Sequence, residues 1–201
     1  MHYISEQEEN IMLARIASLL SACSGELDDM LETYIAQIAE GQTDGLALLY
    51  EQTHAAVYGF ALSILRNAHD AEDVQHDTYV QIWKAAHSYT PSGKPMAWIF
   101  TITRNLARMH LRVHERTISV SPEDWHTMFA HNPAVDNEDR ILLTSLLQIL
   151  SEEERQIVML YSMTGLKHRE IADLLEMKLS TVLSKYNRAI KKLRHAWKEN
   201  P

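Results

Sequence analysis

The stretch from Leu150 to Trp197 constrains the fold most, because it carries the start and stop signals of three consecutive helices. Ser151 and Glu154 have the spacing of a capping box, which predicts that the first helix begins at this point. Gly165 can end that helix, because glycine enters the left-handed region of backbone space at little cost. A second helix is expected over residues 166–176 and a third after a short turn at 177–179, so that the last two form a helix-turn-helix.

The last helix, which opens at Ser180 or Thr181, has one apolar and one basic face. Its apolar residues fall in an arc of roughly 100°, the width of a stripe that faces a core. They are Val182, Tyr186, Ala189, Ile190, Leu193 and Trp197. From Lys178 to Lys198 there are Lys and Arg residues but no Asp or Glu, in a chain whose net charge is −8. This local bias is typical of a phosphate-binding helix. The alternative is a solvated basic helix.

The acidic charge of the 201-residue chain is concentrated at its N-terminus. Residues 1–40 hold eight acidic residues and one base, Arg15, which gives this segment a net charge of −7. One helix is expected over residues 1–24 and a second over 26–40. We interpret residues 1–33 as an acidic helical extension packed on the next domain; the alternative is that it shields a basic face or docks a regulator.

Composition also bounds the location of the protein. The lone cysteine, Cys23, excludes an internal disulfide and suits a reducing compartment. No apolar run approaches the ~20 residues that span a bilayer. The N-terminus is acidic where a signal peptide would be basic. We therefore expect a cytoplasmic protein without membrane insertion.

Two helices are expected between residues 45 and 89. The first runs from Gly45 to Leu65, and Asp70 is expected to cap the second, which extends to Tyr89. The buried face of the second helix is predicted to comprise Val74, Thr78 or Tyr79, Ile82, Trp83 and Ala86. Its other face carries Glu72, Asp73, Gln75, His76 and Asp77. Acids in a first turn usually complement the helix dipole, but this polar surface extends further and permits a protein contact.

A loop with two prolines and one glycine, residues 89–95, precedes a helix from Met96 to about Glu115. Trp98, Ile99, Ile102, Leu106, Met109 and Val113 share one arc, which is predicted to be buried. Thr101, Arg104, Asn105, Arg108 and Arg112 share a neighbouring arc. Arginines at four-residue spacing beside Asn and Thr indicate contacts with phosphates and bases. An exposed charged face is the alternative.

Catalytic and metal chemistry find no support in the sequence. His110 and His114 are four residues apart, but the glutamate of a zinc-hydrolase motif and a third ligand are absent. There is no glycine-rich phosphate loop and no nucleophile elbow. We predict an all-α protein that is not an enzyme, with no catalytic residue, metal or cofactor.

Two segments in this order resemble a known family. DAEDVQHDTYVQIW followed by MAWIFTITRNLARMHLR is similar to region 2 of bacterial RNA polymerase sigma factors of the extracytoplasmic-function (ECF) group. LSEEERQIVMLYSMTGLKHREIADLLEMKLSTVLSKYNRAIKKLRHAW is similar to their region 4. The resemblance implies two small helical domains, region 2 over residues 34–115 and region 4 over 137–201, joined by a linker at 116–136.

The resemblance also implies partners and contact residues. Asp70, Glu72, Asp73, His76 and Asp77 would bind core polymerase. The loop at Thr90–Pro95 and the helix after it would capture the melted −10 element of the promoter through Trp98, Thr101, Arg104, Asn105, Arg108 and Arg112. Thr181, Ser184, Lys185, Asn187, Arg188 and Lys191 would enter the major groove of the −35 element. The implied partners are core RNA polymerase (its β′ clamp helices and β flap) and promoter DNA, with an anti-sigma factor as a further candidate.

Three positions depart from the family pattern. His76 stands where Gln is usual, Leu183 where Lys or Arg is usual, and Ser180 where Gly is usual. The last two leave the −35 sequence open. Two other functions fit parts of the chain: a stand-alone helix-turn-helix regulator that binds DNA as a dimer, and an adaptor that acts through its acidic N-terminus without binding DNA.

Overall fold

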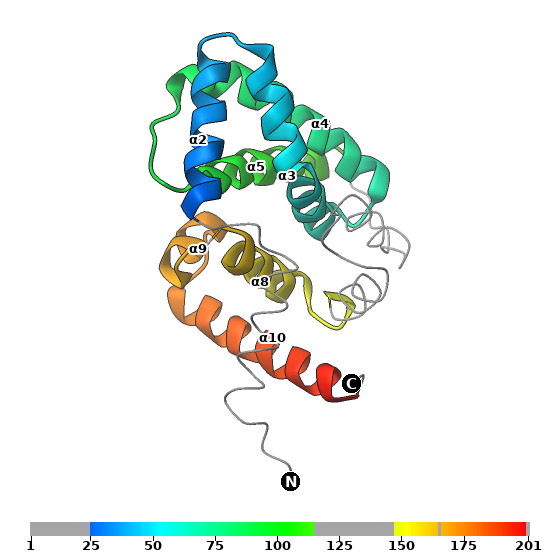
Figure 1. The fold of residues 1–201 in the computed structure, drawn as a ribbon. Helices are drawn as coiled ribbons and strands as arrows, with labels where there is room; N and C mark the ends of the chain where they lie inside the picture. The colour runs from blue at the N-terminus through cyan, green and yellow to red at the C-terminus, as the bar shows by residue number, and fades with distance from the viewer. Residues whose placement is uncertain (1–24, 115–146, 165, 200–201) are drawn as a thin grey trace. The chain divides into compact units, whose positions relative to one another are not determined.

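A computed structural model describes residues 25–114, 147–164 and 166–199, and these residues fall in two compact helical units (Figure 1). The first unit spans residues 25–114 and the second spans 147–199, without Gly165. The described part of the chain contains no β-strand, so the predicted all-α class is confirmed. The helix expected over residues 1–24, the linker at 116–136 and the helix end at Gly165 lie outside the described residues.

The first unit is built around helix α3, Thr43–Leu65, which packs against α2, α4 and α5. α2 spans Gly25–Ala39, α4 spans Ala68–Ala85, and α5 spans Pro95–His114. A short 3-10 helix, η1, covers Ala86–Ser88. The C-terminal half of α3 is buried on all sides, and Phe60 stacks on Phe100 of α5 with ring centroids 4.6 Å apart. This central helix therefore reads as a continuous apolar run rather than an amphipathic one.

Helix α2 is part of this first unit. Leu31 and Ile35 are both almost completely buried, so the expected division after residue 33 falls inside a packed helix. Gly41, with φ +80°, permits the tight turn into α3. At Gly45 the two helices approach so closely that a Cβ atom would lie 2.9 Å from the carbonyl oxygen of Tyr34. Glycine at position 45 thus sets the distance between α2 and α3.

The N-terminus of α4 differs from the prediction. Asn67 is the N-cap, and its side chain accepts the backbone N–H of Asp70 at 3.0 Å. Asp70 lies in the first turn instead of capping the helix, because Asn67 supplies the oxygen that the free amides require. Val74, Thr78, Tyr79 and Ile82 are buried as predicted. Trp83 was predicted to be buried but is 38% exposed.

The buried face of α5 is rotated from the predicted one. The helix buries Met96, Ile99, Phe100, Thr103, Arg104 and Ala107, whereas Met109 is 51% exposed and Val113 73%. Thr103 can be buried because its hydroxyl donates to the carbonyl of Ile99 at 3.0 Å and accepts from Thr78 of α4 at 3.4 Å. The face that packs on α3 and α4 thus includes a polar residue with internal partners, beside Met96, Ile99, Phe100 and Ala107.

The second unit contains α8, Glu152–Thr164, α9, His168–Leu175, and α10, Leu179–Glu199. Glu176 adopts the left-handed conformation, with φ 57°, and ends α9. Ile171, Ala172 and Leu175 of α9 are buried, as are Val182, Ala189, Ile190 and Leu193 of α10. The predicted helix-turn-helix and its apolar stripe are confirmed at these positions. Among the described residues, no helix has the length and apolar character needed to cross a bilayer.

Candidate nucleic-acid interface

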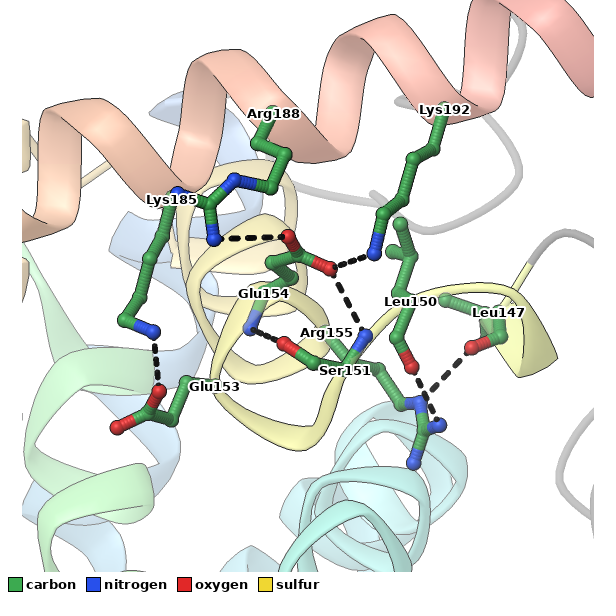
Figure 2. Close-up of polar contacts among 9 residues, drawn as sticks. All are labelled: Leu147, Leu150, Ser151, Glu153, Glu154, Arg155, Lys185, Arg188 and Lys192. Carbon is green, nitrogen blue, oxygen red and sulfur yellow. Dashed lines mark hydrogen bonds and ion pairs between the residues drawn. The ribbon is translucent and has the colours of Figure 1, made fainter.

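The basic face of α10 is held by the N-terminus of α8 (Figure 2). The predicted capping box is present: the N–H of Ser151 donates to Oε2 of Glu154 at 2.9 Å, and the N–H of Glu154 lies 3.4 Å from the Ser151 hydroxyl. The same Glu154 carboxylate accepts from Nζ of Lys192 at 2.6 Å and lies 3.9 Å from Nη1 of Arg188. Next to it, Lys185 pairs with Glu153. The acidic N-terminus of α8 therefore orients three basic side chains of α10.

Glu154 remains ionised within this network. It is only 1% exposed, and its burial raises the pKa, but the hydrogen bonds from Lys192 and the Ser151 backbone outweigh burial and leave the pKa below its ordinary value. These partners stabilise the charged form of the buried carboxylate, and the contacts fix the N-terminus of α8 to the middle of α10.

The residues expected at the −35 element occupy two orientations on α10. Ser184, Asn187, Arg188 and Lys191 are exposed, and Thr181 and Lys185 are half-buried. Lys185 and Arg188 also point toward Glu153 and Glu154 (Figure 2). The exposed group can meet phosphates and base edges directly, whereas Lys185 must leave its carboxylate partner to do so.

Arg155 is a structural residue that the sequence did not reveal. Its guanidinium is buried and donates to the carbonyl oxygens of Leu147 at 2.9 Å and Leu150 at 3.1 Å (Figure 2). These oxygens belong to the turn before α8, where the Leu147 oxygen also accepts the backbone N–H of Leu150 at 3.4 Å. A charged residue one position after a capping box gives no signal of burial, so its role depends on the tertiary structure.

An aromatic cluster joins the three helices of the second unit. His168, the first residue of α9, stacks on Tyr161 of α8 at 4.9 Å and meets Tyr186 of α10 edge-on at 4.5 Å. Burial lowers the pKa of His168 and favours its neutral form. Through Tyr186, the cluster connects α10 to both α8 and α9, in addition to the contacts made by Glu154.

On α5, four of the six residues expected at the −10 element form an exposed face. Thr101, Asn105, Arg108 and Arg112 are exposed, and the last three line an open hollow together with Leu111. Trp98 is half-buried and lies against Tyr89, with ring centroids 4.7 Å apart. Arg104 is 8% exposed, so the structure places it within the packed face rather than beside the other arginines.

The residues expected to bind core polymerase also separate into two groups. Glu72, Asp73, His76 and Asp77 lie on the exposed face of α4. Asp70 is half-buried, and its Oδ1 lies 3.2 Å from Nε2 of His110 on α5. Val80 and Trp83 extend the exposed face. Because Trp83 was predicted to be buried, the sequence did not indicate that this face has an apolar part. An acidic strip with exposed apolar residues is suited to contact another protein.

Comparisons with known proteins agree with this architecture. Residues 49–117 match the family described as Sigma-70 region 2, and residues 140–193 match the family described as Sigma-70, region 4. The chain is 30% identical over 193 residues to "ECF RNA polymerase sigma factor SigK" of Mycolicibacterium vanbaalenii, covering 91% of this chain and 95% of that protein. It is 28% identical to the protein of the same name from Mycobacterium ulcerans, covering 85% and 95%.

Two solved structures share the fold. The structure of CnrH in complex with the cytosolic domain of CnrY aligns with a TM-score of 0.54 at 22% identity, covering 86% of this chain and 99% of that one. The sigma factor RpoE of Bartonella quintana, solved with the anti-sigma factor NepR, aligns with a TM-score of 0.53 at 23% identity, covering 76% and 96%.

Proposed function

The chain belongs to the ECF group of RNA polymerase sigma factors, and we propose that its two units read the −10 and −35 elements of a promoter once bound to core polymerase. The observation that carries this proposal is the presence of an exposed basic helix face on each unit: Arg108 and Arg112 on α5, and Arg188 and Lys191 on α10. Two such faces in one acidic chain are expected of a protein that holds one DNA at two places.

The −10 contacts are assigned to the exposed face of α5. Thr101, Asn105, Arg108 and Arg112 would hold the backbone and bases of the melted strand, with Trp98 as a stacking surface. Arg104 is assigned an indirect role, because a guanidinium that is 8% exposed can support the helix but offers little surface to DNA.

The −35 contacts are assigned to the outward side of α10. Ser184, Asn187, Arg188 and Lys191 would meet the major groove, flanked by Thr181 and Lys185. We propose region 2 over residues 34–115 and region 4 over residues 137–201, with the linker at 116–136 between them; α2 begins before residue 34.

The exposed acidic and apolar strip of α4 is assigned to core polymerase. Catalysis would belong entirely to the polymerase, so this chain would be a non-enzyme that works in the cytoplasm. An anti-sigma factor is a candidate regulator, because the similar sigma factor RpoE of Bartonella quintana was solved in complex with the anti-sigma factor NepR.

Run-off transcription with purified core polymerase tests the proposed function. Adding this chain should give transcripts from promoters selected from a random library, and each promoter should need both of its elements. The matched control is a variant with Arg108→Ala and Arg188→Ala, which should bind core polymerase but not initiate. A stand-alone regulator would instead bind duplex DNA without polymerase and yield no transcript, and an adaptor would do neither.

A further inference from the structure

Glu32 of α2 reaches across to the loop that precedes α5. Its Oε1 atom accepts a hydrogen bond from the hydroxyl of Tyr89 at 3.1 Å and from the backbone N–H groups of Ser92 at 3.1 Å and Gly93 at 2.7 Å. Three donors from one loop therefore converge on a single carboxylate oxygen that lies about sixty residues away in the sequence. Ionised acceptors make stronger hydrogen bonds than neutral ones.

The backbone of the loop is shaped for this contact. Gly93, whose N–H and that of Ser92 both face Glu32, has φ +67°, a left-handed conformation that favours glycine. A Cβ at position 93 would meet no atom within 4 Å, so glycine is needed here for its backbone angle and not for space. The side chains of Thr90 and Ser92 are exposed, and Glu32 anchors the backbone of the loop at Ser92 and Gly93.

The contact also connects the loop to α5. Tyr89 donates to Glu32 with its hydroxyl and packs its ring on Trp98, the first residue assigned to the −10 element. A second α2 carboxylate, Asp28, lies nearby: burial and the neighbouring charges of Glu32 and Asp29 raise its pKa, and Lys94 opposes this. Lys94 is therefore close to the acidic side of α2, and both ends of the loop face that helix.

We propose that Glu32 is a positioning residue that holds the Tyr89–Pro95 loop in the shape that reads the −10 element. The proposal deepens the proposed function and rests on it. A loop that is ordered before DNA binds loses little conformational entropy on binding. Its backbone groups also discriminate between bases, because they cannot move to fit a different base. Glu32 would thus affect which −10 sequences are used, although it touches no DNA.

Run-off transcription on promoters that differ only at −10 or only at −35 tests this role. Glu32→Ala should reduce discrimination among −10 variants by about tenfold, equivalent to about 1.4 kcal/mol, and leave discrimination among −35 variants unchanged. Glu32→Gln should lie between, because its amide oxygen can accept but carries no charge. Asp29→Ala is the matched control: it removes the same charge from the exposed side of α2 and should match the wild type.

A second pair of variants changes the loop without touching α2. Gly93→Val should reproduce Glu32→Ala, because a β-branched residue is strongly disfavoured at this φ, whereas Gly93→Asn should retain discrimination, because Asn tolerates it. Hydrogen exchange of the Ser92 and Gly93 amides reports the anchoring independently of transcription. Both amides should exchange faster in Glu32→Ala than in the wild type and Asp29→Ala.

The outcomes separate the two proposals. A wild type that initiates, together with a Glu32→Ala variant that keeps its −10 preferences, overturns the role of Glu32 and leaves the proposed function intact. Equal losses at −10 and −35 overturn it as well, because they indicate a general loss of structure. A wild type that does not initiate overturns the proposed function, and the reading role of Glu32 with it.

Discussion

At the scale of single residues, one buried carboxylate connects two helices of the second unit. Glu154 completes the capping box of α8 and binds Lys192 of α10, while being only 1% exposed. Removing Lys192 leaves this buried carboxylate without its closest cationic partner, whereas removing Glu154 leaves Lys192 and Arg188 in contact with water. Its contribution to stability therefore depends on its ionisation.

Glu154→Gln should change how the stability of the chain depends on pH. Because the folded state lowers the pKa of Glu154 from 4.5, its contribution is fully present above pH 4.5 and is lost as the pH falls through the lower folded value. At pH 7 the variant should be less stable by about 1–3 kcal/mol. As the pH falls below 4.5, the variant should lose less stability than the wild type.

Chemical denaturation followed by circular dichroism across this pH range measures the effect. Glu152→Gln, at an exposed position of the same helical turn, is the control and should follow the wild type. If the wild type and Glu154→Gln lose stability in parallel as the pH falls, the carboxylate is not the titrating group.

Some residue roles could be predicted from sequence and others could not. The capping box could, because Ser151 and Glu154 act through local spacing alone. The burial of Arg104 and Arg155 could not, because their polar type indicates exposure and their surroundings come from other helices. Asp70 belongs to the same class, since its neighbour His110 is on another helix, forty residues further along the chain.

At the scale of elements, α10 carries neighbouring lysines with different surroundings. Lys191 is exposed, whereas Lys192 is half-buried and bound to Glu154. A basic helix face in sequence is therefore two surfaces in the structure, one directed outward and one that packs the helix on α8.

Lys191→Ala and Lys192→Ala should consequently differ. Lys191→Ala should weaken promoter binding by the holoenzyme and reduce the slope of log affinity against log salt by about one, as expected for one lost phosphate contact. Its unfolding free energy should not change. Lys192→Ala should lower the unfolding free energy by about 1–3 kcal/mol and leave the salt slope unchanged.

Each lysine variant is the control for the other. Fluorescence anisotropy of labelled promoter DNA over a salt series and denaturant titration of the full chain give both quantities. Equal effects of the two substitutions on the salt slope would show that both lysines contact phosphate.

Helix positions were more predictable than helix rotations. The positions of α3, α9 and α10 follow from apolar spacing and the turns between helices, which are local signals, although α9 ends at Glu176 and not at a glycine. The rotation of α5 was predicted wrongly, because two apolar arcs adjoin on this helix and only the packing with α3 and α4 selects one. The selected arc contains Thr103 and Arg104, whose polar type concealed it.

At the scale of the whole molecule, the described residues present three exposed charged surfaces. The exposed basic faces lie on α5 and α10, and the acidic strip lies on α4. The location of charge is thus more informative than the net charge of −8. An acidic protein can bind DNA when its basic side chains are concentrated on two helices.

Asp73→Arg should weaken assembly with core polymerase by about tenfold, because like charges placed at an interface cost about 1.4 kcal/mol or more. Asp73 is exposed on α4 and pairs only at the surface, with His69 at 3.2 Å. Titration of labelled protein with core polymerase measures the affinity. Glu51→Arg reverses an exposed charge on α3 and should bind normally; an equal loss in both variants would contradict the assignment to α4.

The contact between Tyr89 and Trp98 makes the fluorescence of Trp98 sensitive to the position of the loop. Indole emission responds to the rings and dipoles beside it, and Trp98 lies 4.7 Å from the Tyr89 ring at the base of the anchored loop. In a variant whose other three tryptophans are phenylalanine, the remaining emission would report on this one position. Capture of the melted strand could then be followed in real time by light from the protein itself, without an attached dye.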